Sequence, residues 1–171
     1  ERASMPTIAE VTRPWVGLAG VRIDTRLGGR QDLRTSTGLA LRPLVLAEGE
    51  EPVRIPLPEA PGVGAPRIGS VSWSHDSARF AFTLHAADGI ELWTANVRSG
   101  EAERVAGALN TVLTSGFGWM PDGRRLWCLV APADRGPAPE RPEAPSGPAV
   151  QETSGERSPA RTYAGLLEDE C

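Results

Sequence analysis

The chain has no lysine, so all eighteen of its basic residues are arginine. A codon bias toward GC explains this most simply, and it carries no conclusion about function. The 171 residues also include only two cysteines, Cys128 and Cys171, which are too few for a disulfide scaffold. No Cys-x-x-Cys motif or Cys/His cluster indicates zinc. No apolar run approaches the length of a membrane span, so no membrane-spanning helix is expected.

Clustered basic charge is absent as well. The net charge is −4, and the charged residues are dispersed along the chain. A nucleic-acid interface would need basic residues gathered on one surface, so this partner class is excluded. The hydrophobic fraction of 40% is enough for a core, and the 19 glycines and 16 prolines favour many turns.

Two stretches of the chain follow one plan: SVSWSHDSARFAFTL (70–84) and GWMPDGRRLWCLV (118–130). In each, a short apolar run ends in tryptophan, a turn with aspartate follows, and a second apolar run begins. The paired residues are Trp73 with Trp119 and Asp76 with Asp122, 119 − 73 = 46 residues apart. The second turn reads Pro121-Asp122-Gly123, a strong turn sequence, because Pro presets φ and Gly tolerates positive φ. The pattern predicts two matching hairpins, with structural roles for these turn residues and tryptophans.

Further strands are predicted at 38–46, 53–57, 90–97 and from residue 103. Residues 38–50 resemble residues 89–101 at an offset of 51, which supports the repeat. A four-stranded antiparallel unit of about 40–50 residues with a Trp-x-x-Asp hairpin is typical of a β-propeller blade. The fold class is therefore all-β, with residues 1–130 as an incomplete propeller of about two to three blades, not closed.

The strand after the second turn has apolar residues on both faces, which indicates packing above and below, as between blades. The tryptophans are interpreted as filler between blades, not as a stacking platform for ligands. They are Trp73, Trp93, Trp119 and Trp127.

Outside these units the pattern weakens. Residues 1–37 have little periodicity. Residues 131–161 contain seven prolines among Ser, Gly and Glu, which predicts an irregular insertion or linker. Residues 162–171 could form a short helix, and the chain is expected to be a piece of something longer.

Catalytic motifs are missing. The chain has no Gly-x-Ser-x-Gly elbow, phosphate loop, dinucleotide fingerprint or His-Glu-x-x-His motif. His75, in a predicted turn, and His85, at a predicted strand end, are interpreted as solvated residues and not as bases. No catalytic residue, metal or cofactor is predicted.

Several stretches resemble the glutamyl endopeptidase branch of the prolyl oligopeptidase family, in the same order over nearly the whole chain. These are LAGVRID (18–24), Gly38-Leu39, Leu109-Asn110, DRGP (134–137), PSGP (145–148), Arg161-Thr162-Tyr163 and LLEDE (166–170). The resemblance implies an N-terminal propeller that covers and filters access to a C-terminal α/β-hydrolase domain with a Ser-Asp-His triad. It also implies peptide substrates and cleavage after Glu. None of the triad positions falls within this chain.

An acidic side chain is best held by arginine, and the most family-like stretches contain Arg22 and Arg135. Both are predicted as candidate substrate-binding residues. The expected partners are the hydrolase domain of the same parent chain and peptides. A bacterial cytoplasmic or periplasmic location is expected, with the compartment left open.

Two other interpretations stay open. One is a propeller binding module of the WD-repeat or periplasmic translocation type, without an enzyme attached. The other is a degraded or frameshifted reading frame whose product does not fold. The coding sequence after Cys171 would distinguish them.

Overall fold

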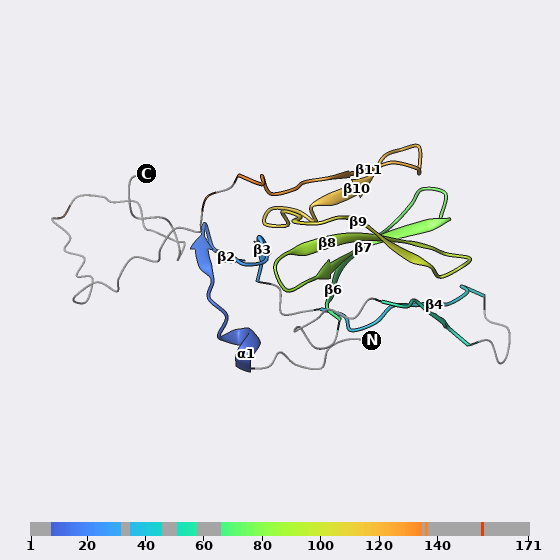
Figure 1. Cartoon of the computed structure of the whole chain (residues 1–171), viewed down its shortest axis with the longest axis horizontal. Coiled ribbons are helices and arrows are strands. Elements are labelled where there is room, and N and C mark those ends of the chain that lie inside the picture. The colour runs from blue at the N-terminus through green and yellow to red at the C-terminus, as the bar shows by residue number, and fades with distance from the viewer. Residues whose placement is uncertain are drawn as a thin grey trace.

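The computed structural model describes residues 8–31, 35–45, 51–57 and 66–134, together with Gly136 and Gly155. This part of the chain is built from antiparallel strands and contains one four-residue helix, α1 (Ile8–Val11) (Figure 1). The strands are β1 Val16–Leu18, β2 Val21–Asp24, β3 Gly29–Arg30, β4 Ala40–Leu41, β5 Val53–Arg54, β6 Ile68–Trp73, β7 Arg79–His85, β8 Ile90–Asn96, β9 Ala102–Ala106, β10 Phe117–Trp119 and β11 Leu126–Cys128.

The centre of the structure is a four-stranded sheet in the order β6-β7-β8-β9. All three pairings are antiparallel, and in the register Phe82 lies opposite both Val71 and Trp93. Sequential strands joined by tight turns make a meander, as the sequence predicted for residues 70–106. Bulges interrupt the register near Ile68 and near Leu92.

The central sheet is apolar on both faces, because successive side chains of a strand point to opposite sides. One face, here the β4 face, carries Phe80, Phe82 and Leu84 and packs against Ile55 and Leu41 of the β4–β5 region. The other, the β10 face, has its own set of core residues. These are Ala81, Ile90 and Leu92, packed with Leu27, Leu109, Phe117, Trp119, Leu126 and Cys128.

The sheet is thus the middle layer of three. Figure 1 shows the β10–β11 hairpin on one side of it and β4 on the other. The Nε1 of Trp119 in β10 donates a hydrogen bond of 3.2 Å to the carbonyl of Ser72 in β6, so β10 lies over the first strand of the sheet.

The two hairpin tips repeat the same hydrogen bonds 46 residues apart. In β6–β7, Ser74 N donates to Arg79 O and Ser77 N to Ser74 O, at 2.9 Å each. In β10–β11, the corresponding N–H groups of Met120 and Gly123 bond Arg125 O and Met120 O at 2.8 and 3.0 Å. Ser77 and Gly123 also share a positive φ, 56° and 67°. The repeat predicted from the sequence is therefore present in the backbone.

The β4–β5 pair is the counterpart of β8–β9. Adding 51 to Ala40 and Val53 gives 91 and 104, which fall within β8 and β9. The strands are much shorter than predicted, however. The predicted strand 38–46 is reduced to Ala40–Leu41, and 53–57 to Val53–Arg54. Proline has no N–H for a strand ladder, so Pro43 on one side and Pro52 and Pro56 on the other limit the pairing.

The N-terminal part forms a three-stranded meander, β1-β2-β3, that the weak periodicity of residues 1–37 did not predict. Strands of three, four and two residues are too short to show an alternating pattern. The turn before β3 depends on Asp24, which is buried and accepts hydrogen bonds from the N–H groups of Arg26 and Leu27.

The tryptophans differ in their environment. Trp119 is 9% exposed, whereas Trp73 and Trp127 are 50% and 44% exposed in this chain. Trp73 stacks at a tilt on Phe80 with ring centroids 5.4 Å apart. The Trp127 ring lies against Gly118 on the paired strand, where a Cβ would approach its ring atoms to 2.7 Å. Trp93 is partly buried against the β4-face core, whereas Trp73 and Trp127 leave apolar surface open. The interpretation of the tryptophans as filler between blades stays a prediction.

Some predictions fall on residues that the structure does not describe. The predicted helix at 162–171 lies wholly outside the described residues. The predicted insertion at 131–161 does so apart from residues 131–134, Gly136 and Gly155.

We expect Phe82→Ala to lower the free energy of unfolding by about 3–5 kcal/mol, because it removes a fully buried ring from the centre of the sheet. Val105→Ala, at a side chain that is 48% exposed on β9, should change it by no more than about 0.5 kcal/mol. Urea unfolding followed by tryptophan fluorescence measures both. Equal losses in the two variants would contradict the packing described here.

Candidate functional site

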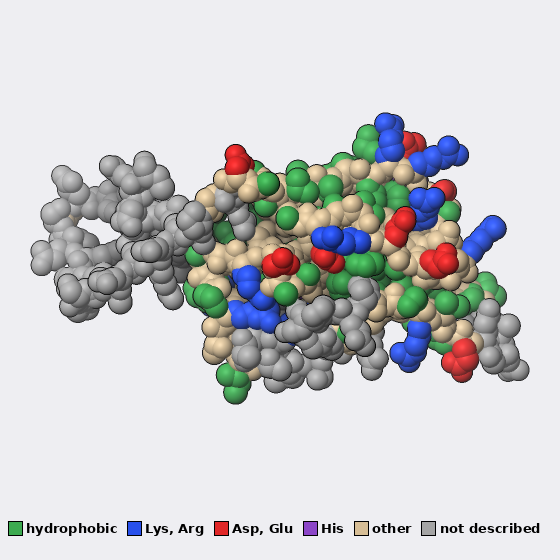
Figure 2. Space-filling view, viewed as in Figure 1, with side chains coloured by type: hydrophobic (Ala, Val, Ile, Leu, Met, Phe, Trp, Pro, Cys, Tyr) green, Lys and Arg blue, Asp and Glu red, His purple; other side chains and the backbone are tan. Residues whose placement is uncertain are grey.

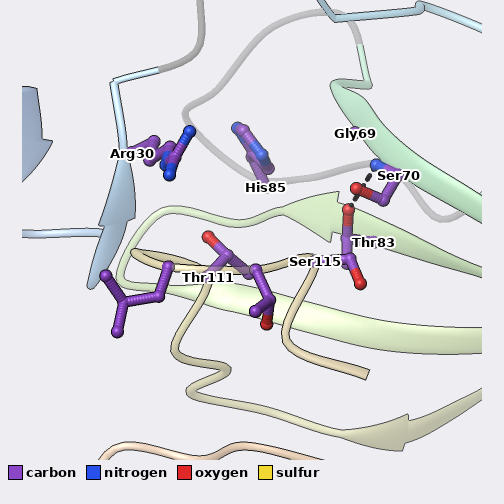
Figure 3. Close-up of a pocket in the computed structure, with 9 residues that line it drawn as sticks. Arg30, Gly69, Ser70, Thr83, His85, Thr111 and Ser115 are labelled. Atoms are coloured by element: carbon purple, nitrogen blue, oxygen red, sulfur yellow. Dashed lines mark hydrogen bonds between the residues drawn. The ribbon is translucent and has the colours of Figure 1, made fainter. Parts of the chain in front are cut away.

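A cavity of about 330 Å³ lies on the β10 face of the central sheet. It is bounded by the start of β6, the end of β7, the end of β3 and the loop that precedes β10 (Figure 3). Its lining is formed by Arg30, Gly69, Ser70, Thr83, His85, Thr111, Leu113, Thr114 and Ser115.

Strands β6 and β7, which are paired, form the floor of the cavity. Thr83 on β7 is buried, and its Oγ1 accepts a 3.0 Å hydrogen bond from the N–H of Ser70 on β6, the dashed line in Figure 3. Gly69 precedes Ser70 and lets the Thr83 side chain lie close to the β6 backbone. A Cβ at this position would lie 2.6 Å from Thr83 Oγ1 and 3.4 Å from His85 Nε2.

One side of the cavity is held by Arg30, the last residue of β3. Its Nε donates a 2.6 Å hydrogen bond to the carbonyl of Val112, in the loop before β10. A second arginine, Arg26, makes an analogous bond from Nη1 to the carbonyl of Ala87, also at 2.6 Å, but does not line the cavity. The two arginines therefore fasten the β2–β3 region to loops of the central sheet.

His85 differs from its sequence-based interpretation. It lies at the end of β7 as predicted and pairs with Ile90 on β8, but it is 7% exposed and not solvated. Residues at the end of β7 alternate between the two faces, which places His85 on the β10 face with Thr83, where it lines the cavity together with residues of the loop before β10. His75 lies in the exposed turn, as the sequence predicted.

Among the described residues, the lining provides hydrogen-bond donors and the fixed positive charge of Arg30, and it includes neither Asp nor Glu. Five of the nine residues carry hydroxyl groups, which both donate and accept. Within the described ranges, no group of three or more His, Cys, Asp or Glu residues could hold a metal ion. These side chains can donate hydrogen bonds to an acceptor-rich group.

The arginines selected from the sequence lie elsewhere. Arg22, on β2, is exposed, and its guanidinium carbon sits 4.6 Å from the centre of the Trp15 ring. It does not line this cavity. Arg135 lies outside the described residues. Sequence reasoning missed Arg30, and the only signal for it was its place directly after the Gly28-Gly29 turn.

The predicted turn residues lie at the two hairpin tips. Asp122 Oδ1 accepts hydrogen bonds from the N–H groups of Arg124 and Arg125, both at 3.0 Å, and Oδ2 pairs with Arg125 Nε at 2.6 Å. These bonds to the carboxylate lower the pKa of Asp122 to about 2. The pKa of Asp76 is also lowered, first by the Ser74 hydroxyl and then by the N–H of Ala78.

The surface shows no single-sign patch on the face seen in Figure 2, where acidic and basic side chains are interspersed among apolar ones. No helix in the described part of the chain is long and apolar enough to cross a membrane. Cys128 is a half-buried free cysteine beside the β10-face core, in keeping with its predicted place in an apolar strand.

Two curated plant proteins are similar to the whole chain. One, from Oryza sativa subsp. japonica, is named "Probable glutamyl endopeptidase, chloroplastic" and is 34% identical over 184 aligned residues. The other, from Arabidopsis thaliana, carries the same name and is 31% identical over 183. The alignments cover 99% of this chain but 19% and 18% of the relatives. No family model matches, and no solved structure matches significantly.

The chain is thus related to proteins named as peptidases and spans about a fifth of their length. Membership of the prolyl oligopeptidase family stays a prediction. Bacterial origin also stays a prediction, since the two relatives are plant proteins.

We expect Asp122→Asn to lower the midpoint of thermal unfolding at pH 6 and to have a much smaller effect near pH 2. A carboxyl whose pKa is depressed in the folded state stabilises the fold at pH values above its unfolded-state pKa of about 3.9. Most of this contribution is lost as the pH falls to the folded-state pKa of about 2.

The control is Asp88→Asn, at an exposed carboxyl in the β7–β8 turn. It should shift the midpoint little at either pH. A difference between Asp122→Asn and the unsubstituted chain that stays constant from pH 6 to pH 2 would show that charge at Asp122 does not stabilise the turn.

Proposed function

We propose that this chain is part of a β-propeller of a serine-type endopeptidase that cleaves after Glu, and that it filters access to the active site. The chemistry would be carried out by an α/β-hydrolase part outside these 171 residues. The observation that carries the proposal is the similarity to glutamyl endopeptidases over 99% of this chain, although it covers less than a fifth of them.

The layered arrangement supports the propeller. The central sheet has the strand order and meander connections of one blade. On one face lies β4–β5, the counterpart of the outer two strands of a preceding unit. On the other lies β10–β11, the counterpart of the inner two strands of a following unit. Sheets stacked face to face through apolar side chains are how adjacent blades pack.

The exposed apolar side chains of the last hairpin support further units. Trp127, Leu129 and Val130 are between 44% and 54% exposed, all on or directly after β11. A following blade half would cover this surface, as β10–β11 covers the central sheet.

The role as a filter would need no catalytic residue within this chain. Neither the sequence nor the described structure offers a nucleophile elbow, a metal group or a cofactor fingerprint. A propeller placed over an active site would admit peptides and exclude folded proteins, and this function needs no catalytic residue of its own.

The test uses the full-length protein that contains this chain and fluorogenic peptides that differ only in Glu, Gln or Asp before the scissile bond. We expect cleavage after Glu to exceed cleavage after Gln by at least about a hundredfold in kcat/KM, because a site built for a charged group rejects its neutral analogue. The control is replacement by Ala of the serine in a Gly-x-Ser-x-Gly motif elsewhere in that protein, which should abolish turnover.

The same Glu-containing sequence, placed in a surface loop of a folded carrier protein, should resist cleavage if the propeller is a filter. A full-length protein without peptidase activity, but with peptide binding, would favour a propeller binding module instead. Rapid cleavage of the folded carrier would overturn the filter role.

A further inference from the structure

We infer that the cavity on the β10 face binds a carboxylate group of a peptide, with Arg30 as the source of charge. The inference rests on the proposed function for the identity of the ligand as a peptide. It assigns the recognition of acidic groups to a part of the molecule distinct from the arginines selected from the sequence.

The charge of the lining favours an anion. Arg30 is permanently cationic, and among the described residues that line the cavity none is Asp or Glu. The remaining polar lining consists of His85 and the hydroxyl-bearing residues Ser70, Thr83, Thr111, Thr114 and Ser115. A group that accepts several hydrogen bonds, such as a carboxylate, matches this surface better than a cation or an apolar side chain.

The hydrogen bond from Arg30 Nε to the carbonyl of Val112 orients the guanidinium group. Only Nε is used in the hydrogen bond to Val112 O, so the two Nη groups remain for a ligand. Two N–H groups of one guanidinium can meet the two oxygens of a carboxylate. Figure 3 shows Arg30, His85 and Thr111 around the same opening.

The Thr83 hydroxyl is also oriented. Its oxygen accepts the N–H of Ser70, so its own hydrogen is directed elsewhere and can be donated to a ligand. Gly69 allows the Thr83 hydroxyl to keep this position, because a Cβ there would collide with Thr83 Oγ1 and come within 3.4 Å of His85 Nε2. A glycine within a strand weakens the strand, and its place here is consistent with a close approach by another group.

The volume limits the size of the ligand. About 330 Å³ lies at the lower end of the range for small-molecule sites, which suits one amino-acid side chain or one chain end. A peptide has two such carboxylates, the side chain of Glu and the C-terminus, and the same cavity chemistry would take either.

The test measures binding by fluorescence anisotropy to the full-length protein, with its hydrolase serine blocked by a covalent inhibitor. Three fluorescein-labelled heptapeptides are compared. The first has one central Glu and an amidated C-terminus, the second has Gln instead of Glu with the same amide, and the third has Gln with a free C-terminal carboxylate. We expect the first or the third peptide to bind at least about tenfold more tightly than the second, and which of them does so identifies the carboxylate.

Arg30→Gln should weaken binding of the preferred peptide by about ten- to a hundredfold, the range for a hydrogen bond to a charged group. Arg26→Gln is the matched control, because it removes an analogous tether to a backbone carbonyl away from the cavity. It should change the dissociation constant by less than about twofold. Equal weakening by both variants would mean that loop tethering, not carboxylate binding, is responsible, and would overturn the inference.

Three further variants, at two other positions, keep the test independent of Arg30. Thr83→Val should weaken binding and Thr83→Ser should restore it, because only serine retains the donor. Gly69→Ala should weaken binding, because the added methyl group would displace the Thr83 hydroxyl. Unchanged affinity in Thr83→Val and Gly69→Ala, with a cooperative thermal transition retained, would count against the cavity as the site.

The inference and the proposed function fail separately. If Arg30→Gln cleaves after Glu with the same KM as the unsubstituted protein, the proposed function is supported and the proposed binding site is contradicted. Carboxylate-dependent binding without any cleavage would leave the site standing and remove the peptidase function.

Discussion

The structure depends on one constraint: the central sheet has to be covered on both faces. Phe80, Phe82 and Leu84 point one way and Ala81, Ile90 and Leu92 the other, and all six are at most 2% exposed. A sheet with one wet face would alternate apolar with polar residues. Here each face demands a further layer, so β4–β5 and β10–β11 are held in place by burial of apolar surface, and the cavity forms where the second of these layers meets β3.

The fold was predictable where the sequence repeats the same hairpin motif. The Trp-x-x-Asp hairpins appear in the structure with matching hydrogen bonds, since Asp76 and Asp122 accept from the same backbone positions. The strands of 68–106 were found because long strands display their period. Strands β1–β3 were not, because two to four residues around Gly28 carry too little pattern to distinguish a strand from a loop. Strands β4 and β5 were found, but they are shorter than predicted.

The cavity could not have been predicted in the same way. Arg30 and Val112 are 82 residues apart, and their contact depends on how one layer lies over another. His85 was interpreted as solvated because it ends a strand, but it is 7% exposed, and it lines the same cavity as the loop of residues 111–115, which is distant in the sequence. Local sequence gives the direction of a side chain along a strand, whereas burial is decided by distant segments.

The tether from Arg30 to Val112 has a consequence for motion. The same guanidinium holds the loop before β10 through Nε and faces the cavity with its remaining N–H groups. An anion on those groups fixes the guanidinium plane and, with it, the carbonyl that the loop presents. Ligand binding in the cavity and opening of that loop are therefore thermodynamically linked. A bound ligand slows amide hydrogen exchange around Val112, and a change that favours loop opening lowers the affinity for the ligand by the same factor.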